Sequence, residues 1–363
     1  MLAIRKTMVG LLGTACIAIV LLHSARAQGG ALPYAQMAER IAVSLAPGQG
    51  EVAILRFDPA VMPELEAATR TALEKRGVKV ESLAYGPVEG LEGKLAHADI
   101  YVWLPTAPGR PTEPEQAAAL GRWLDAGRGR QIHFHWADGT RAVDSGIGRH
   151  DAAFDRIYLN ALEIDYAALN REQDTAIAKL RSGEVRVTTP QGTDLRFRIG
   201  DRPVTKQNGD ASREAMKRAR VRIDREIELP AGVIRVAPLE ESVNGRIVIP
   251  GARIAGVRVA NIRLQFVNGK ITEISASTNE PALRGYLAEG SALRSFREFA
   301  LGFNPKLHAP QGSPWVAYYG YGAGMVRLSL GDNSELGGNV RGGAVHWFFF
   351  PGADVLVNGK SIF

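Results

Sequence analysis

The chain has 363 residues, of which 44 are basic and 38 acidic, giving a formal net charge of +6, and it contains one cysteine. This near balance of charge gives no reason to expect nucleic acid as a partner. The single cysteine, Cys16, lies in an N-terminal apolar stretch. A chain without that stretch can form neither a disulfide nor a thiolate metal site.

Residues 1–27 have the pattern of a secretory signal peptide. Arg5 and Lys6 precede an apolar core at 8–22, and Ala-Arg-Ala at 25–27 is a small-x-small cleavage site. The core has 15 residues, whereas a spanning helix needs about 20. The sequence therefore predicts export to the periplasm or the outside, with no membrane anchor after cleavage. Removal of the three basic residues of this segment would leave 41 basic and 38 acidic residues, a charge of +3.

Residues 34–165 alternate short apolar runs with helical patterns. Strands separated by helices of about a dozen residues indicate βαβ units and a mostly parallel sheet. We therefore predict an α/β domain here. The expected strands are 51–57, 78–83, 97–104 and 131–136, and the expected helices are 63–76 and 114–126.

Residues 170–363 are richer in strand patterns and predict a β-rich α+β domain. Residues 183–199 read as a hairpin, and Asn268-Gly269 is a strong two-residue hairpin turn. Further strands are expected at 232–237, 246–249, 262–267, 270–276, 324–330, 343–350 and 353–357, and helices at 280–289 and 291–301.

The sequence QIHFHW at 131–136 carries two histidines, and no phosphate loop, G-x-S-x-G elbow or H-E-x-x-H pair is present. His133 and His135 are two residues apart on an expected strand, so they face the same side. They could hold a metal ion with a third ligand, for which Asp138 is the near candidate, or they could be two packed histidines at a sheet edge.

Four stretches of the second half, in order, carry a family resemblance: GEVRVTTPQGTDLRFRI, ELPAGVIRVAPLEESVNGRIVIP, REFALGFNPKL and LGDNSELGGNVRGGAVHW. Together they resemble the thermophilic metallo-aminopeptidase family of the aminopeptidase T and aminopeptidase S type. The resemblance implies an α/β N-terminal domain, a β-rich C-terminal domain and a possible homodimer. It also implies two divalent metal ions, held by two glutamates, two histidines and one aspartate, that activate water to release N-terminal residues from peptides.

Residue by residue, the resemblance retains two of the five metal ligands, Glu298 in the expected helix 291–301 and His346. The other three positions hold Val233, Arg327 and Phe348. Valine and phenylalanine have no donor atom, and arginine stays protonated and repels a cation. The sequence therefore predicts no metal, or a weakly bound divalent ion that would be zinc, cobalt or manganese in an active protein.

A rebuilt metal site is the alternative, because other polar residues belong to the same motifs. Glu240 and Glu241 could supply a carboxylate, and His308 or Asp332 could move in as a further ligand. Asp332 and Asn333 could also line the same cleft.

Glu298 itself has two further interpretations. It could be a helix-surface carboxylate paired with Arg294 one turn earlier. Alternatively, Arg327 could neutralise it in place of the lost ion, because a buried carboxylate needs a partner. The second interpretation predicts that Arg327 and Glu298 lie within salt-bridge distance.

Two functions follow from these positions. The substitutions favour a non-catalytic descendant that binds a peptide or a small envelope ligand. The alternative is an active metal-dependent aminopeptidase that works through a rebuilt site.

Overall fold

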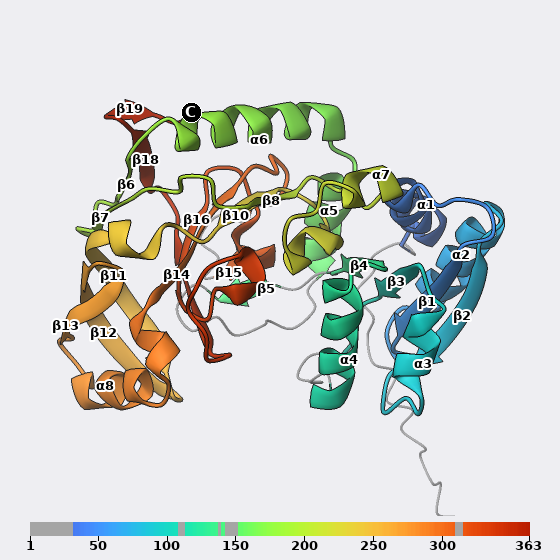
Figure 1. Cartoon of the computed structure of the whole chain (residues 1–363), viewed down its shortest axis with the longest axis horizontal. Helices are drawn as coiled ribbons and strands as arrows, with labels where there is room; N and C mark the ends of the chain where they lie inside the picture. The colour runs from blue at the N-terminus through green and yellow to red at the C-terminus, as the bar shows by residue number, and fades with distance from the viewer. Residues whose placement is uncertain (1–31, 108–112, 137–138, 142–151, 309–314) are drawn as a thin grey trace, which may run out of the picture. The chain divides into compact units, whose positions relative to one another are not determined.

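The computed structural model describes residues 32–107, 113–136, 139–141, 152–308 and 315–363 (Figure 1). Its first sheet is parallel throughout, with strand order β2-β1-β3-β4-β9. The strands are β1 (Val52–Phe57), β2 (Lys79–Ala84), β3 (Ile100–Trp103), β4 (Arg130–Phe134) and β9 (Glu226–Leu229). Because β9 comes from the second half of the sequence, the segments 34–165 and 170–363 share this sheet. Pro33–Phe363 accordingly forms one compact unit.

The helices follow apolar patterns on one face. In α1 the buried residues Met37, Ile41 and Leu45 recur every four positions, which turns one stripe toward the interior. Two helices, α2 and α4, begin with proline, a residue preorganised for the first helical position. Among the described residues, no helix is both long enough and apolar enough to cross a bilayer. The helices are α1 (Tyr34–Leu45), α2 (Pro63–Glu74), α3 (Leu91–Ala96), α4 (Pro114–Asp125), α5 (Ala152–Leu162), α6 (Tyr166–Arg181), α7 (Arg213–Met216) and α8 (Glu280–Ala288).

Two antiparallel sheets make up most of the second half. The central one has the order β17-β16-β14-β10-β8, and the outer one the order β13-β12-β11-β7-β6-β18-β19, with α8 beside β12 (Figure 1). A parallel sheet with helices, followed by antiparallel sheets, confirms the predicted fold class. The central strands are β8 (Val204–Gln207), β10 (Val233–Val236), β14 (Phe296–Gly302), β16 (Val326–Gly331) and β17 (Val345–Phe350).

The outer strands are β6 (Val185–Thr188), β7 (Asp194–Phe197), β11 (Asn244–Ile254), β12 (Val257–Val267), β13 (Lys270–Ser275), β18 (Asp354–Val357) and β19 (Lys360–Ser361). A small pair joins β5 (Gly139–Arg141) to β15 (Trp315–Ala317). Short 3-10 turns are η1 (Arg222–Arg225), η2 (Glu240–Ser242), η3 (Ser291–Arg294), η4 (Tyr318–Gly320) and η5 (Ser334–Leu336).

The helix predicted at 291–301 is wrong. Residues 291–294 form the single turn η3, and residues 296–302 form the strand β14 between β10 and β16. All seven residues of β14 are buried, so the strand lacks the alternation of polar and apolar residues that marks a half-exposed strand.

The central and outer sheets pack through phenylalanine rings. Phe197 lies 5.2 Å from Phe299 and 6.2 Å from Phe296, and Phe266 lies 5.9 Å from Phe296, measured between ring centroids. Phe299 therefore belongs to the apolar face of the central sheet. The next residue on the opposite face of β14 is Glu298.

Candidate functional site

Glu298 lies at the centre of the central sheet, with none of its side chain exposed. Arg235 Nε of β10 lies 2.6 Å from Glu298 Oε1, and Arg327 Nη2 of β16 lies 2.8 Å from the same oxygen. Arg297 Nη1 donates to the other oxygen, Oε2. We call these three arginines the arginine cage. The predicted ion pair between Arg327 and Glu298 is confirmed.

The register of the sheet explains this arrangement. Ala300 of β14 pairs with Arg235 on one side and with Arg327 on the other. Directly paired residues of antiparallel strands share a face, so both guanidinium groups lie over the small Ala300 side chain. Glu298 pairs with Ser329, two positions from Arg327 on the same face. Neither Arg235 nor Arg297 was identified from the sequence.

The cage continues to a second carboxylate. Arg235 Nη2 lies 3.1 Å from Glu335 Oε1, Arg297 Nη2 donates to the same oxygen, and Arg222 Nη2 lies 3.6 Å from Oε2. Burial alone would raise the pKa of Glu298, but the attraction of the arginines outweighs it and holds that pKa well below its usual value. Glu298 is therefore an ionised, internally neutralised carboxylate.

These residues do not fit the divalent metal ions that the family resemblance implies. Both oxygens of Glu298 accept hydrogen bonds from guanidinium groups. A dication placed there would meet three fixed positive charges, and Val233 offers it no donor atom. The position that the resemblance assigns to a metal ligand is filled by an ion-pair network.

His346 lies on the other face of the same sheet. It pairs with Leu330, whereas its neighbour Trp347 pairs with Ser329, the partner of Glu298. The Tyr286 hydroxyl of α8 lies 3.2 Å from His346 Nδ1. Burial lowers the pKa of His346 to about 4.

Phe348 shares the face of His346, with ring centroids 4.7 Å apart. Val233 and Arg327 lie on the face of Glu298, where Arg327 Cζ also stands 5.9 Å from the Trp347 ring. The structure thus brings Glu298, Val233 and Arg327 together and separates them from His346 and Phe348.

Asp332, Asn333 and Glu240, which were expected to line a cleft, instead make hydrogen bonds that stabilise the loop after β16. Asp332 accepts hydrogen bonds from the backbone N–H groups of Ser334 at 2.8 Å, Gly342 at 2.8 Å and Gly343 at 3.0 Å. Burial alone would raise the pKa of Asp332, but these bonds and one from the Ser334 hydroxyl at 2.6 Å outweigh it and lower that pKa to about 2. Asp332 therefore holds the loop that follows β16.

Asn333 and Glu240 stabilise the same loop. Asn333 Nδ2 donates to Glu240 Oε1 at 3.1 Å, and Asn339 N donates to that oxygen at 2.7 Å. Glu240 Oε2 accepts a bond from Arg202, while Glu241, the middle residue of η2, is exposed. Both carboxylate oxygens of Glu240 thus accept hydrogen bonds that hold this loop.

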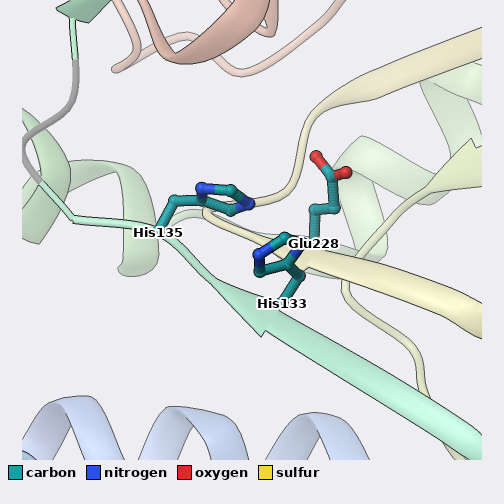
Figure 2. A group of neighbouring side chains, drawn as sticks. All are labelled: His133, His135 and Glu228. Atoms are coloured by element: carbon teal, nitrogen blue, oxygen red, sulfur yellow. The ribbon is translucent and has the colours of Figure 1, made fainter. Parts of the chain in front are cut away.

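A second cluster lies on the parallel sheet. His133 and His135 of β4 and Glu228 of β9 each offer one ligand atom, and these atoms lie within 4.8 Å of one another (Figure 2). We call these three residues the His–His–Glu cluster. The expected third ligand, Asp138, lies outside the described residues, and Glu228, which the sequence reading did not identify, takes that place.

The surroundings of both histidines in this cluster favour the neutral imidazole over the protonated form. Burial lowers the pKa of His133, partly offset by Glu228, and burial with the neighbouring His133 lowers the pKa of His135 well below its usual value. The two ring centroids are 4.0 Å apart. Two neutral imidazoles beside a carboxylate have the donor types that a borderline dication prefers.

A family model for the thermophilic metalloproteases (M29) matches residues 165–309, and no curated protein matches the chain. The solved structure of 2,5-dihydroxypyridine dioxygenase from Pseudomonas putida KT2440 is similar, with a TM-score of 0.61 and 16% identity over 90% of this chain and 94% of that chain. Wild-type AmpT from Thermus thermophilus is similar with a TM-score of 0.56 and 17% identity over 91% and 99%. At these identities the two likenesses establish the fold alone.

The chain therefore shares its fold with AmpT and the dioxygenase, and this shared fold defines its structural class. Within that class, the expected resemblance to the thermophilic metallo-aminopeptidase family is confirmed over residues 165–309. The matched segment contains Val233 and Glu298 and ends before Arg327 and His346.

Proposed function

We propose that this chain is an exported, non-catalytic relative of the metallo-aminopeptidases that binds a peptide or a small envelope ligand. The observation that carries the proposal is the arginine cage around Glu298. Three guanidinium groups supply the positive charge that the family takes from metal ions, and they stay protonated at every relevant pH. An arginine cannot ionise a water molecule or polarise a carbonyl as a Lewis acid does, so peptide hydrolysis at this position is lost.

The proposed ligand position is a cavity of about 780 Å³ between α1, α6, α7 and β8. Its size lies within the roughly 300–1,000 Å³ of small-molecule sites. Its lining includes Arg40, Lys206 and Arg218 together with Asp174 and Asp210. Charges of both signs suit a peptide, which carries an ammonium group at one end and a carboxylate at the other.

A hydrolysis assay tests the loss of catalysis. The purified protein is incubated with a mixed peptide library and zinc, cobalt or manganese, and released amino acids are quantified beside an active aminopeptidase. We expect no release above that of the buffer. Release that disappears on chelation would overturn the proposal and identify the chain as a working metallo-aminopeptidase.

A binding assay tests the ligand class. Calorimetry with short peptides is expected to give saturable binding that Arg218→Glu weakens. Arg263→Glu should leave the binding unchanged, because Arg263 is an exposed residue of β12 that does not line the cavity. Equal effects of the two variants would exclude the cavity as the peptide site.

Cell fractionation checks the proposed export, and light scattering during gel filtration checks the homodimer that the family resemblance implies.

A further inference from the structure

We propose that the His–His–Glu cluster is a zinc site, with His133, His135 and Glu228 as its three protein ligands. This site lies on the parallel sheet and uses none of the residues that the family resemblance assigns to metal. The proposal is independent of the proposed ligand-binding function, because it concerns metal binding and leaves peptide binding and hydrolysis aside.

Strand geometry brings the three ligands to one face. His133 pairs directly with Glu228 across the parallel ladder of β4 and β9. His135 follows two residues later and is held there because its backbone N–H donates to Leu229 O at 2.9 Å. Phe134, between the histidines, points to the opposite face and stacks on Trp136 at 5.9 Å. Figure 2 shows the two imidazole rings next to each other, with Glu228 beside them.

The cluster sits where open α/β sheets commonly bind ligands. Its residues lie at the carboxyl ends of β4 (Arg130–Phe134) and β9 (Glu226–Leu229), which run parallel. Ligands of such sheets bind in the crevice outside the carboxyl ends of the strands. The three side chains are half-buried, so an ion bound by them would be partly shielded from solvent.

The donor set favours zinc. Two imidazole nitrogens and one carboxylate oxygen form the three-ligand set of many zinc sites that keep the fourth position for water. Calcium and magnesium prefer oxygen ligands, so two histidines disfavour them. In a tetrahedral zinc site the ligand atoms stand roughly 3.3 Å apart. The ligand atoms here lie within 4.8 Å of one another, so the side chains must approach by at most about 1.5 Å to bind zinc.

Tyr321 supports the carboxylate. Its hydroxyl donates a hydrogen bond to Glu228 Oε2, and its ring lies 6.0 Å from Arg327 Cζ of the arginine cage. Hydrogen bonds of this kind orient ligating carboxylates and tune metal affinity. We therefore assign Tyr321 as a positioning residue for the zinc site.

Metal titration of the full chain tests the site. Chelator-treated protein is titrated with Zn²⁺ against a competing indicator, and bound zinc is counted by atomic absorption. We expect one zinc per chain. We also expect a rise in the unfolding temperature with zinc concentration, because an ion that binds only the folded state stabilises it by mass action. A chain that binds no zinc under these conditions would overturn the proposal.

Variants locate the ion. His135→Ala and the isosteric Glu228→Gln are each expected to lower zinc affinity by at least about a hundredfold. Tyr321→Phe is expected to lower it roughly tenfold, as is usual for outer partners of metal ligands. His346→Ala is the matched control, because it removes a half-buried histidine from a different sheet, and we expect it to bind zinc as the wild type does. Equal losses in His346→Ala and His135→Ala would reject the site.

Two further readouts separate ligand loss from misfolding and zinc from other ions. The unfolding temperature without metal shows whether each variant folds, and the zinc-dependent rise shows whether it binds. Cobalt bound at the same site should give the visible absorption of a tetrahedral complex, absent in Glu228→Gln. Tighter binding of Mn²⁺ than of Zn²⁺ would contradict the assigned metal, because nitrogen-rich sites normally bind zinc more tightly than manganese.

Discussion

Glu298 and His346 lie on opposite faces of one antiparallel sheet, because Glu298 pairs with Ser329 while His346 pairs with the adjacent Leu330. The two side chains that the family resemblance retains therefore point away from each other. Glu298 belongs to the arginine cage, and His346 belongs to the contact between β17 and α8.

Loss of the Glu298 charge should be severely destabilising. Glu298→Gln keeps the shape of the side chain but leaves the buried arginines without their central counter-charge, which should cost roughly 3–5 kcal/mol in free energy of unfolding. Urea denaturation followed by circular dichroism measures the loss. Glu335→Gln is the control, because its side chain is 26% exposed against 0% for Glu298 and water can replace part of its role. An equal or larger loss in the control would contradict a network centred on Glu298.

Asp332 should make stability depend on pH in acid. Its pKa is about 2 in the folded chain against an ordinary value of 3.8, so its contribution is complete above about pH 4 and is lost as the pH falls toward 2. The shift corresponds to roughly 2 kcal/mol. We expect Asp332→Asn to be destabilised by about this amount at pH 7 and to converge with the wild type near pH 2. The exposed Asp201→Asn serves as the control, and a gap between wild type and Asp332→Asn that stays constant with pH would refute the assignment.

The ion pair of Glu51 with Arg130 should matter more than the pair of Glu51 with Arg213. Arg130 Nη2 lies 2.7 Å from Glu51 Oε2, and the two side chains are 3% and 2% exposed. Arg213, which reaches Glu51 from α7, is 62% exposed. We expect Glu51→Gln to cost roughly 3–5 kcal/mol and Arg213→Ala no more than about 1 kcal/mol. Thermal or urea unfolding of the two variants measures the difference, and a reversed order would show that the exposed pair anchors α7.

Gly302 at the end of β14 should tolerate no side chain. A Cβ atom there would lie 2.0 Å from Gly322 O and 2.7 Å from Gly320 O, both backbone atoms that cannot turn aside. Gly302→Ala should lower the free energy of unfolding by at least about 2 kcal/mol. Gly285→Ala in α8 is the control, because nothing lies within 4 Å of its added Cβ, and alanine should stabilise that helix by roughly 0.5–1 kcal/mol. A folded Gly302→Ala protein of wild-type stability would disprove the close approach.

Local sequence signals predicted the regular parts of the fold. The apolar run at 51–57 became β1, and Asn268-Gly269 became the turn between β12 and β13, with positive φ at both residues as a tight hairpin turn requires. Such features depend on neighbours in the chain. The ion pair of Arg327 with Glu298 could also be predicted, because a buried carboxylate without its metal requires a cation.

Features set by pairing between distant strands could not be predicted. Arg235 reaches Glu298 only because β10 and β14 lie side by side with Ala300 between the arginines. Glu228 meets His133 only because β9 joins a sheet made from the first half of the chain. The sequence near each residue contains no signal of these contacts.

The parallel sheet can be completed only after β9 (Glu226–Leu229) has been synthesised, because the other four strands come from residues 52–134. During synthesis, β4 (Arg130–Phe134) has no neighbour on its outer side until β9 has emerged, so the parallel sheet keeps an open edge for a long part of translation. Unpaired strand edges are sites of intermolecular pairing and aggregation. A fragment ending at residue 165 would carry that edge permanently, so we expect it to aggregate under conditions in which the full-length chain stays in solution.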